Sequence, residues 1–541
     1  SVALEGTNPE LSARYTIDCT EPTLSSPVLP AAPINTDTNL CLRVKYFSEA
    51  DTIMPSPTKT NAYIYDAPTV LPVFSVVTDP KYLWSDSLGI LFEGDSALNK
   101  PTNIWQDWER PASVTLLRGG RIEFSLDMGV GLRGYYGSRI QPQKSFNLSA
   151  RTEYGISDID CKIFPNKKAD SYKRIMLRNG GQDWAKAMIR DAVCSELAQP
   201  IDIDYKAYFP CRLFLNGAYW GLYFCMEKND EHFISTNYDC DKEDITVLLA
   251  EGNPEAGSSL AFRTKFNAMV SSDLENDSVF AEMTKFIDLN NLIDYYNHEI
   301  IISNIDWPGN NLKMWQNHKE DSKWRFILYD CDWTLALESN EYYNSFDHML
   351  SETATNWCNS PASTLMIRSL FRNQNFKRAF ISRFADMLNS SHSTKRIIRV
   401  TDSIYSLIRE ELPAHNARWG NPLSGIESEL DRIRSFATNR PSVARGYAAY
   451  YIENSPTFSL EIESNRPDSL SMDVNTLKNL PGEFAGVYFN SVPVRVVLRP
   501  AAGLRVKQIE GYAGEVKDTI ILTTAKDTLR IKVILESTTT P

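Results

Sequence analysis

The most informative absences in this sequence concern long apolar runs and basic clusters. No run of about 18 apolar residues occurs, so no segment is predicted to span a membrane. Lys and Arg number 56 against 68 Asp and Glu, a formal net charge of −12, and they form no block. A nucleic-acid polymer is therefore not an expected partner, because its phosphates need clustered cations. A nucleotide site stays open, since it needs only a few local cations and a metal ion.

Cysteine and histidine patterns typical of metal sites are also missing. The nine cysteines stand singly without a Cys-x-x-Cys pair, and the six histidines form no His-x-His or His-x-x-x-His pair. Structural zinc sites and thioredoxin-like redox sites are therefore not expected. The odd count leaves at least one thiol unpaired, and whether Cys19 pairs with Cys41 stays open.

The length and patterning of the chain predict three parts. At 541 residues the chain exceeds what one hydrophobic core usually organises. Short β-prone runs separated by Thr, Pro and Ser predict a small β module in residues 1–68. Residues 69–450 mix strand and helix patterns, and residues 456–541 return to alternating strands. We predict a multidomain α+β protein whose central domain is flanked by small immunoglobulin-like β-sandwich modules.

Four predicted elements organise the central part. Apolar residues at helical spacing predict an amphipathic helix over Lys186–Gln199 and a second helix over Asp288–Ser303. Lys144–Ala150 is typical of a strand, and two strand-like runs flank Asn216-Gly217, the strongest hairpin signal in the chain.

The stretch after the second predicted helix indicates phosphoryl-transfer chemistry. Asp306 and Asn311 have the Asp-x-x-x-x-Asn spacing of protein-kinase catalytic loops, in which Asp faces the acceptor hydroxyl and Asn binds metal. Two strand-like runs then lead directly into Asp330-Cys331-Asp332. A carboxylate at the end of a buried strand can be held rigidly beside Mg²⁺ or Mn²⁺. Each motif alone also fits an ordinary turn, but their order is more demanding.

A glycine-rich segment and a lysine lie upstream. Gly129–Gly134 matches G-x-G-x-x-G but opens no obvious helix, so a dinucleotide-binding fold is not favoured. A glycine turn over nucleotide phosphates suits this segment better, and Gly134–Arg139 is an alternative location for that turn. Lys144, at the start of a predicted strand, could contact phosphate oxygens. A plain hairpin with a solvated lysine is the alternative.

The central part resembles the CotH kinase-like family, the spore-coat protein H type of atypical protein kinase. The similar stretches are Leu71-Pro72-Val73-Phe74, Arg133-Gly134, Ser138-Arg139, Pro142-Gln143-Lys144-Ser145-Phe146, Leu177-Arg178-Asn179-Gly180, Arg190-Asp191, Asn216-Gly217-Ala218-Tyr219-Trp220-Gly221-Leu222-Tyr223, Glu227, Asn304-Ile305-Asp306, Asn311 and Tyr329-Asp330-Cys331-Asp332.

This resemblance implies a two-lobed, protein-kinase-like domain with an ATP site between the lobes. It implies transfer of the ATP γ-phosphate to Ser or Thr of a protein, with Mg²⁺ or Mn²⁺ as the metal. Asp306 would then be catalytic, and the metal residues would be Asn311, Asp330 and Asp332. The cofactor-binding residues would be Ser138, Arg139, Lys144, Arg178 and Glu227.

The flanking part suggests where the protein works. Ala13–Thr23 is similar to chitobiase-type C-terminal β modules, with Cys19 at the usual glycine. This resemblance implies a β-sandwich and a secreted or cell-envelope location in a bacterium, with surface anchoring through a removed N-terminal signal as one route. The sequence begins at Ser1 without a charged and apolar leader, so either a signal peptide has been removed or none existed. A cell-surface glycan or protein is then an expected partner of the β modules.

Two other functions stay open. Asn304-Ile305 replaces the His-Arg of other kinases, and Cys331-Asp332 replaces Phe-Gly, as an inactive kinase-like scaffold or adhesion protein would allow. A metal-dependent phosphoesterase built on Asp306, Asp330 and Asp332 is less favoured, because that class usually adds grouped histidines.

Overall fold

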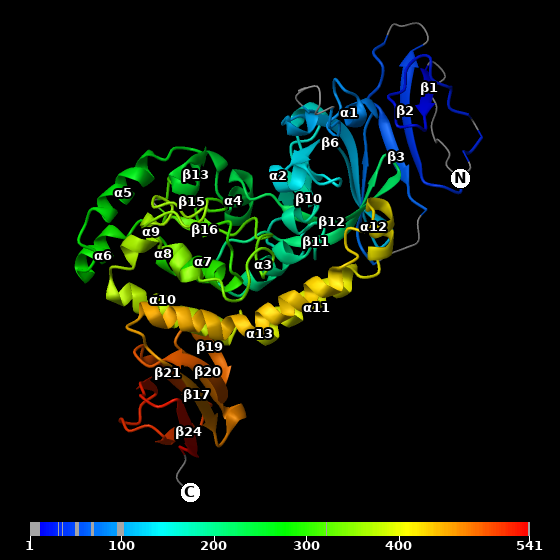
Figure 1. Ribbon diagram of the computed structural model, residues 1–541. Helices are drawn as coiled ribbons and strands as arrows, with labels where there is room; N and C mark the ends of the chain where they lie inside the picture. The colour runs from blue at the N-terminus through cyan, green and yellow to red at the C-terminus, as the bar shows by residue number, and fades with distance from the viewer. Residues whose placement is uncertain are drawn as a thin grey trace. The chain divides into compact units, whose positions relative to one another are not determined.

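The computed structural model describes residues 11–30, 32–34, 36–48, 53–65, 70–94, 102–320 and 322–538. The chain forms two compact units (Figure 1). The first comprises residues 1–189, 206–240 and 404–426, and the second comprises residues 190–205, 241–403 and 427–541. Both contain helices and sheets, which confirms the multidomain α+β prediction.

The N-terminal part of the first unit is a three-stranded antiparallel sheet. Its strands, in the order β1-β2-β3, are β1 (Leu11–Thr16), β2 (Leu40–Ser48) and β3 (Lys59–Tyr63). The predicted boundary at residue 68 lies outside the described residues. The immunoglobulin-like and chitobiase-like descriptions of this part stay predictions.

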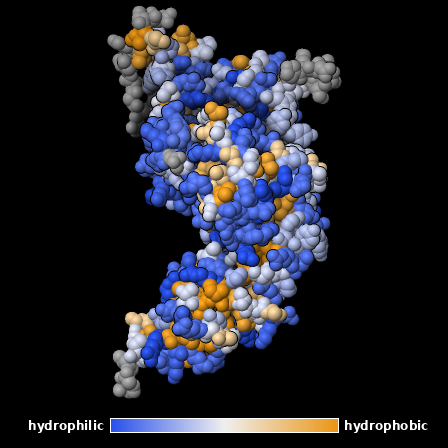
Figure 2. Space-filling view, turned by 90° about the vertical axis from the view of Figure 1, so that its left-hand side faces the viewer, coloured by the Kyte–Doolittle hydropathy of each residue, from blue (hydrophilic) through white to orange (hydrophobic). Residues whose placement is uncertain are grey.

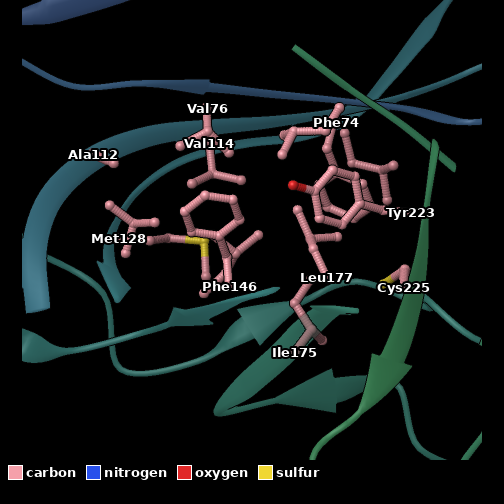
Figure 3. Packing of buried hydrophobic residues seen from close by; sticks show 14 of the residues in the cluster. Phe74, Val76, Ala112, Val114, Met128, Phe146, Ile175, Leu177, Tyr223 and Cys225 are labelled. Carbon is pink, nitrogen blue, oxygen red and sulfur yellow. The ribbon is translucent and has the colours of Figure 1, made fainter. Parts of the chain in front are cut away.

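A closed barrel forms the centre of the first unit. In the order β10-β12-β11-β4-β5-β6-β7, its strands are β10 (Arg174–Arg178), β12 (Ala218–Glu227), β11 (Tyr208–Leu215), β4 (Val73–Val77), β5 (Glu109–Arg118), β6 (Arg121–Arg133) and β7 (Ser145–Ser149). Alternate residues point inward, as the strand period requires: Phe146 on β7, Leu177 on β10 and Tyr223 on β12 meet inside (Figure 3). The predicted strand at Lys144 and the Asn216-Gly217 hairpin are both present.

Short helices and a small ribbon complete the first unit. They are α1 (Lys81–Trp84), α2 (Tyr136–Arg139), β8 (Ile159–Asp160), β9 (Ser171–Tyr172), α4 (Glu231–Tyr238) and α12 (Leu412–Trp419). Helix α12 packs on β12, where the Trp419 indole donates to the Trp220 carbonyl at 2.9 Å and the Leu222 N–H donates to His415 Nδ1 at 3.1 Å.

The second unit places helices around a four-stranded sheet of order β14-β13-β15-β16. The strands are β13 (Ile245–Leu249), β14 (Pro254–Ala256), β15 (Lys313–Asn317) and β16 (Arg325–Ile327). The helices are α3 (Arg190–Ala198), α5 (Leu260–Val270), α6 (Asp277–Met283), α7 (Leu289–Ile302), α8 (Ser345–Leu350), α9 (Leu365–Leu370), α10 (Gln374–Asn389), α11 (Thr394–Ile408) and α13 (Ile426–Tyr451). No helix in the described part of the chain is long and apolar enough to cross a membrane.

One predicted helix starts later than expected. The prediction placed it over Lys186–Gln199, but α3 begins at Arg190. Asp183 accepts the Ala187 N–H at 3.1 Å, and Met188 has a positive φ of 63°. This turn consumes the N-terminal residues of the predicted helix, because a left-handed residue interrupts helical hydrogen bonding.

The last strands form two four-stranded sheets beside α10. One has the order β20-β17-β24-β22 and the other β19-β18-β21-β23. The strands are β17 (Thr457–Ser464), β18 (Leu470–Val474), β19 (Leu477–Pro481), β20 (Glu483–Phe489), β21 (Val494–Pro500), β22 (Leu504–Glu510), β23 (Thr519–Leu522) and β24 (Thr528–Ser537). Hydrophobic residues gather over this C-terminal region on the face shown in Figure 2. Its classification as an immunoglobulin-like module stays a prediction.

Candidate functional site

The loop that follows α7 brings Asp306 and Asn311 together. Helix α7 begins after Asp288, whose side chain accepts the Asn291 N–H as an N-cap, and it is capped at its C-terminus by Ser303 with φ 56°. Asn311 donates its amide to Asp306 Oδ2 at 2.8 Å, and Asn310 donates to Oδ1 at 3.1 Å. Both carboxylate oxygens of Asp306 are therefore oriented by residues of its own loop.

The environment of Asp306 disfavours its charged form. Burial, together with the smaller effect of the Asp330 charge, raises the pKa of Asp306 to about 6. The amides of Asn310 and Asn311 oppose this shift, because they stabilise the carboxylate. Perturbed carboxyl groups of this kind cluster at functional sites.

Asp330 follows β16 and is connected to the same loop. Strands β15 and β16 pair antiparallel, so the predicted order of helix, Asp-x-x-x-x-Asn, hairpin and Asp-x-Asp is confirmed. Asn311 Nδ2 also donates to the Asp330 carbonyl at 3.3 Å, and Asp191 on α3 accepts the Cys331 N–H at 3.2 Å. Asp332 is buried, with 5% of its surface exposed. Asn311 thus joins the two motifs through a single amide group.

Two of these residues have left-handed backbone conformations. Asn311 has φ 48° and Asp330 has φ 58°. Asn and Asp adopt this conformation more readily than other non-glycine residues. Residues held in such conformations concentrate at functional sites.

The segment of residues 356–359, called the Cys358 strap below, contacts the Asp306 loop. The Cys358 thiol donates to the Ile305 carbonyl at 2.8 Å, and the Cys358 carbonyl accepts the Gly309 N–H at 2.5 Å. His348 Nε2 contacts the Trp307 carbonyl. Burial, with a further contribution from the Asp306 charge, raises the pKa of Cys358 to about 12, so this thiol stays protonated at neutral pH and acts as a donor.

The oxygen donors of this loop suit a metal ion that arrives with nucleotide phosphates. Asn311 uses its amide nitrogen, and not Oδ1, in its contacts with Asp306 and Asp330. Mg²⁺ is usually held by one or two carboxylates together with water and substrate phosphates. Among the described residues, no group of three or more His, Cys, Asp or Glu side chains could hold a metal by itself. The donor set therefore fits a nucleotide-borne ion and not an all-protein metal cage.

Lys144 lies in the first unit, immediately before β7. Its ammonium contacts Glu93 Oε1 at 2.5 Å and the Gln141 carbonyl at 2.7 Å, and only 3% of its side chain is exposed. The Tyr223 hydroxyl donates to the Lys144 carbonyl at 2.9 Å from inside the barrel. Lys144 is therefore not the solvated hairpin lysine of the alternative interpretation.

The glycine turn lies at Gly134–Arg139, not in the upstream glycines. Gly129 and Gly131 belong to β6, and a Cβ on Gly131 would lie 2.7 Å from the Trp108 carbonyl oxygen. Gly134 has φ 88°, and a Cβ there would lie 2.6 Å from Ser138. The first two glycines thus serve strand packing, and the expectation of a turn at Gly129–Gly134 is wrong.

Arg139 and Ser138 are both buried in this turn. Arg139 donates to the carbonyls of Gly134 and Ile104, each at 2.8 Å, and to Asp107 at 2.7 Å. The Ser138 carbonyl accepts from Asn179 Nδ2 at 3.4 Å. These contacts hold the turn, and the predicted cofactor contacts of both side chains stay predictions.

Arg178 and Glu227 end neighbouring barrel strands. Arg178 is the last residue of β10 and Glu227 the last of β12. Glu227 is 2% exposed, accepts the Ala207 N–H at 2.8 Å and lies 3.5 Å from the Lys167 ammonium. A cofactor role for either residue stays a prediction.

Two residues that hold these segments in place were not among the predicted site residues. Asn179 is fully buried, and its Oδ1 accepts from Ser145 at 2.8 Å and from Gly181 at 2.9 Å. It fixes the chain on both sides of Lys144, since Nδ2 donates to the Gln143 carbonyl at 2.5 Å. Cys358 is the second position. Asn179 lay in a family-like stretch and could have been singled out, whereas no local pattern marks Cys358.

Comparisons with known proteins give a family match. The sequence model of the family described as CotH kinase protein matches residues 130–444, and no curated protein matches the chain. The crystal structure of a Helicobacter pylori proinflammatory kinase, CtkA, is similar at 10% sequence identity and a TM-score of 0.23, covering 65% of this chain and 97% of that one. A likeness at this TM-score does not bear on the fold.

Proposed function

The chain belongs to the CotH kinase family, and on that premise we propose that it is an atypical protein kinase. It transfers the γ-phosphate of ATP to a Ser or Thr of another protein, in the presence of Mg²⁺ or Mn²⁺. The observation that carries this proposal is the amide of Asn311, which contacts both the Asp306 carboxylate and the Asp330 carbonyl. A catalytic-loop acid and a metal-binding acid are expected in such proximity.

Each residue has a separate task in this proposal. The metal, when bound, neutralises the negative charge of the phosphates. Asn311, Asp330 and Asp332 would hold it, and Asp306 accepts the proton of the acceptor hydroxyl. Lys144 contacts phosphate oxygens, and its ion pair with Glu93 orients the ammonium.

The first unit supplies the other proposed nucleotide-binding residues. Ser138, Arg139, Arg178 and Glu227 are proposed to shape the cofactor site from the turn and the barrel ends. Arg139 already satisfies backbone carbonyls, so we assign it the task of shaping the turn and not of binding phosphate directly.

Calorimetric titration of the purified chain with ATP tests the proposal. We expect saturable binding with Mg²⁺ or Mn²⁺, and no binding without metal or in Asp330→Ala. Asp518→Ala, an exposed aspartate of the C-terminal region, is the matched control and should bind as the wild type does. Failure to bind ATP under every metal condition would favour the inactive scaffold instead.

We also propose that the protein works outside the cytoplasm or in the cell envelope. The resemblance of residues 13–23 to chitobiase-type modules supports this location, as does the family's association with spore coats. Cell fractionation with an antibody against the chain tests it. Recovery of the chain only from the cytoplasm would contradict it, together with the proposed glycan or protein partner of the β modules.

A further inference from the structure

A buried carboxyl group contacts Asn304 at the start of the Asp306 loop. Glu299, near the end of α7, is fully buried. Its Oε2 accepts from Asn304 Nδ2 at 2.9 Å, whereas its Oε1 has no hydrogen-bond partner among the residues that the structure describes. Within the described ranges, no cation contributes to the electrostatic environment of Glu299. A buried carboxylate without such a partner is costly, because leaving water disfavours its charged form.

Asn304 connects this carboxyl to the proposed catalytic residue. Its N–H donates to the Glu299 carbonyl at 3.1 Å, and its Oδ1 accepts the Asp306 N–H at 3.0 Å. Asn304 is itself 1% exposed, so water does not compete for these bonds. The side chain of Glu299 therefore sets the orientation of an amide that holds the backbone of Asp306.

The surroundings of Glu299 favour its protonated form. Burial raises the pKa of Glu299 to about 8, while Asn304 and Tyr295 lower it only in part. The titratable groups that face it are Tyr295, Tyr296 and Cys331. Burial raises the pKa of each of these three, so all stay neutral and none supplies a positive charge. The local charge is lowest when Glu299 is a neutral acid.

We propose that Glu299 is a positioning residue that holds the Asp306 loop, through Asn304, as an uncharged carboxylic acid. This inference deepens the proposed kinase function and rests on it. The acid receives the Asn304 amide on one oxygen and carries its proton on the other. Ionisation would place an uncompensated charge behind the loop and disturb the contact that fixes Asp306.

Three variants separate this role from a merely structural one. Glu299→Gln keeps the neutral shape and an oxygen acceptor, whereas Glu299→Ala and Asn304→Ala each break the connection. We expect Glu299→Ala to lower kcat about 10- to 100-fold with a nearly unchanged KM for ATP, because misplacing a catalytic group affects chemistry more than binding. Glu299→Gln should keep the wild-type kcat, because the amide has the shape of the neutral acid. Glu282→Gln, on an exposed glutamate of α6, is the control.

Two measurements do not depend on phosphoryl transfer. The infrared difference spectrum between wild type and Glu299→Gln should show the C=O stretch of a protonated acid at neutral pH. Hydrogen exchange of residues 304–311 should be faster in Glu299→Ala and in Asn304→Ala than in wild type, but not in Glu299→Gln. Should Glu299→Ala fail to fold, Asn304→Ala supplies the same comparison.

The outcomes decide the inference separately from the proposed function. A missing acid band, or a Glu299→Gln variant as impaired and as fast-exchanging as Glu299→Ala, would overturn it. If the wild type transfers no phosphate while the acid band and the exchange differences are present, the positioning role stands and the kinase activity falls.

Discussion

At the residue scale, the Asp306 loop is held by short polar contacts from both sides. Asn304 accepts the Asp306 N–H at the start of the loop, and Asn311 donates to the Asp306 carboxylate from its end. The Cys358 thiol donates to the Ile305 carbonyl. The strap comes so close that position 309 has no room for a side chain: a Cβ on Gly309 would lie 2.4 Å from the Cys358 carbonyl oxygen. The loop conformation therefore depends on a contact between residues far apart in the sequence.

Gly309→Ala should consequently displace the strap or the loop. We expect a loss of about 1–3 kcal/mol in the free energy of unfolding, the usual cost of overpacking, together with weaker metal-dependent ATP binding. Denaturant unfolding and calorimetric titration measure the two effects. Gly425→Ala is the matched control, because a Cβ there meets no atom within 4 Å. Equal stability of the two variants would mean that the strap does not press on Gly309.

At the element scale, α10 is attached to the C-terminal strands by hydrogen bonds to a buried aspartate. Asp386 accepts the Thr476 N–H at 2.9 Å and Oγ1 at 2.5 Å, and the Tyr488 hydroxyl at 3.1 Å. Arg383, one turn earlier, donates to Thr476 Oγ1 at 2.7 Å and pairs with Asp294 on α7. The helix thus connects the C-terminal strands with the helix that precedes the Asp306 loop.

Asp386→Ala should loosen this attachment. Removing the carboxylate leaves the Thr476 and Tyr488 donors unpaired in a buried place, which costs about 1–3 kcal/mol for each unsatisfied group. Differential scanning calorimetry should show a lower Tm, and limited proteolysis should release a fragment containing residues 457–538. Asp431→Ala, whose carboxylate is mostly exposed and pairs with Arg434, is the control. A Tm drop no larger than that of the control would show that Asp386 does not anchor the region.

At the scale of the whole molecule, stability depends on the charges that folding buries. The unfolded chain releases the Glu299 proton near its ordinary pKa of 4.5, whereas the folded chain keeps it until about pH 8. The raised pKa therefore contributes stability that is complete below 4.5 and declines as pH rises to about 8. Over this window the unfolding free energy should fall by about 1.4 kcal/mol per pH unit from this group alone.

Glu299→Gln should lack this slope. As pH rises from about 4.5 to about 8, the unfolding free energy of the wild type should fall relative to that of the variant. Above about pH 8 the difference should stay constant. Urea denaturation at several pH values measures it, with Glu282→Gln as the control that keeps the wild-type slope. Parallel curves for wild type and Glu299→Gln would show that Glu299 is already ionised in the folded chain.

Much of the local structure follows from the sequence. The strand-like run Lys144–Ala150 and the Asn216-Gly217 turn predict β7 and the hairpin of β11 and β12, and the helical spacing of apolar residues predicts α7. The order of Asp306, Asn311 and Asp330 likewise indicates the loop and the family. The spacing of Tyr295 and Glu299, four residues apart on the same helix, places the glutamate on the buried stripe and could have revealed it.

Only the tertiary structure decides which partners these residues find. The sequence by itself determines the elements, the family and the candidate acids, since these depend on neighbours within a few positions. The pairing of Lys144 with Glu93, the support of Ser145 by Asn179 and the close approach of Cys358 to Gly309 span 51, 34 and 49 positions of the chain. Contacts across such separations arise from packing, which no local periodicity encodes.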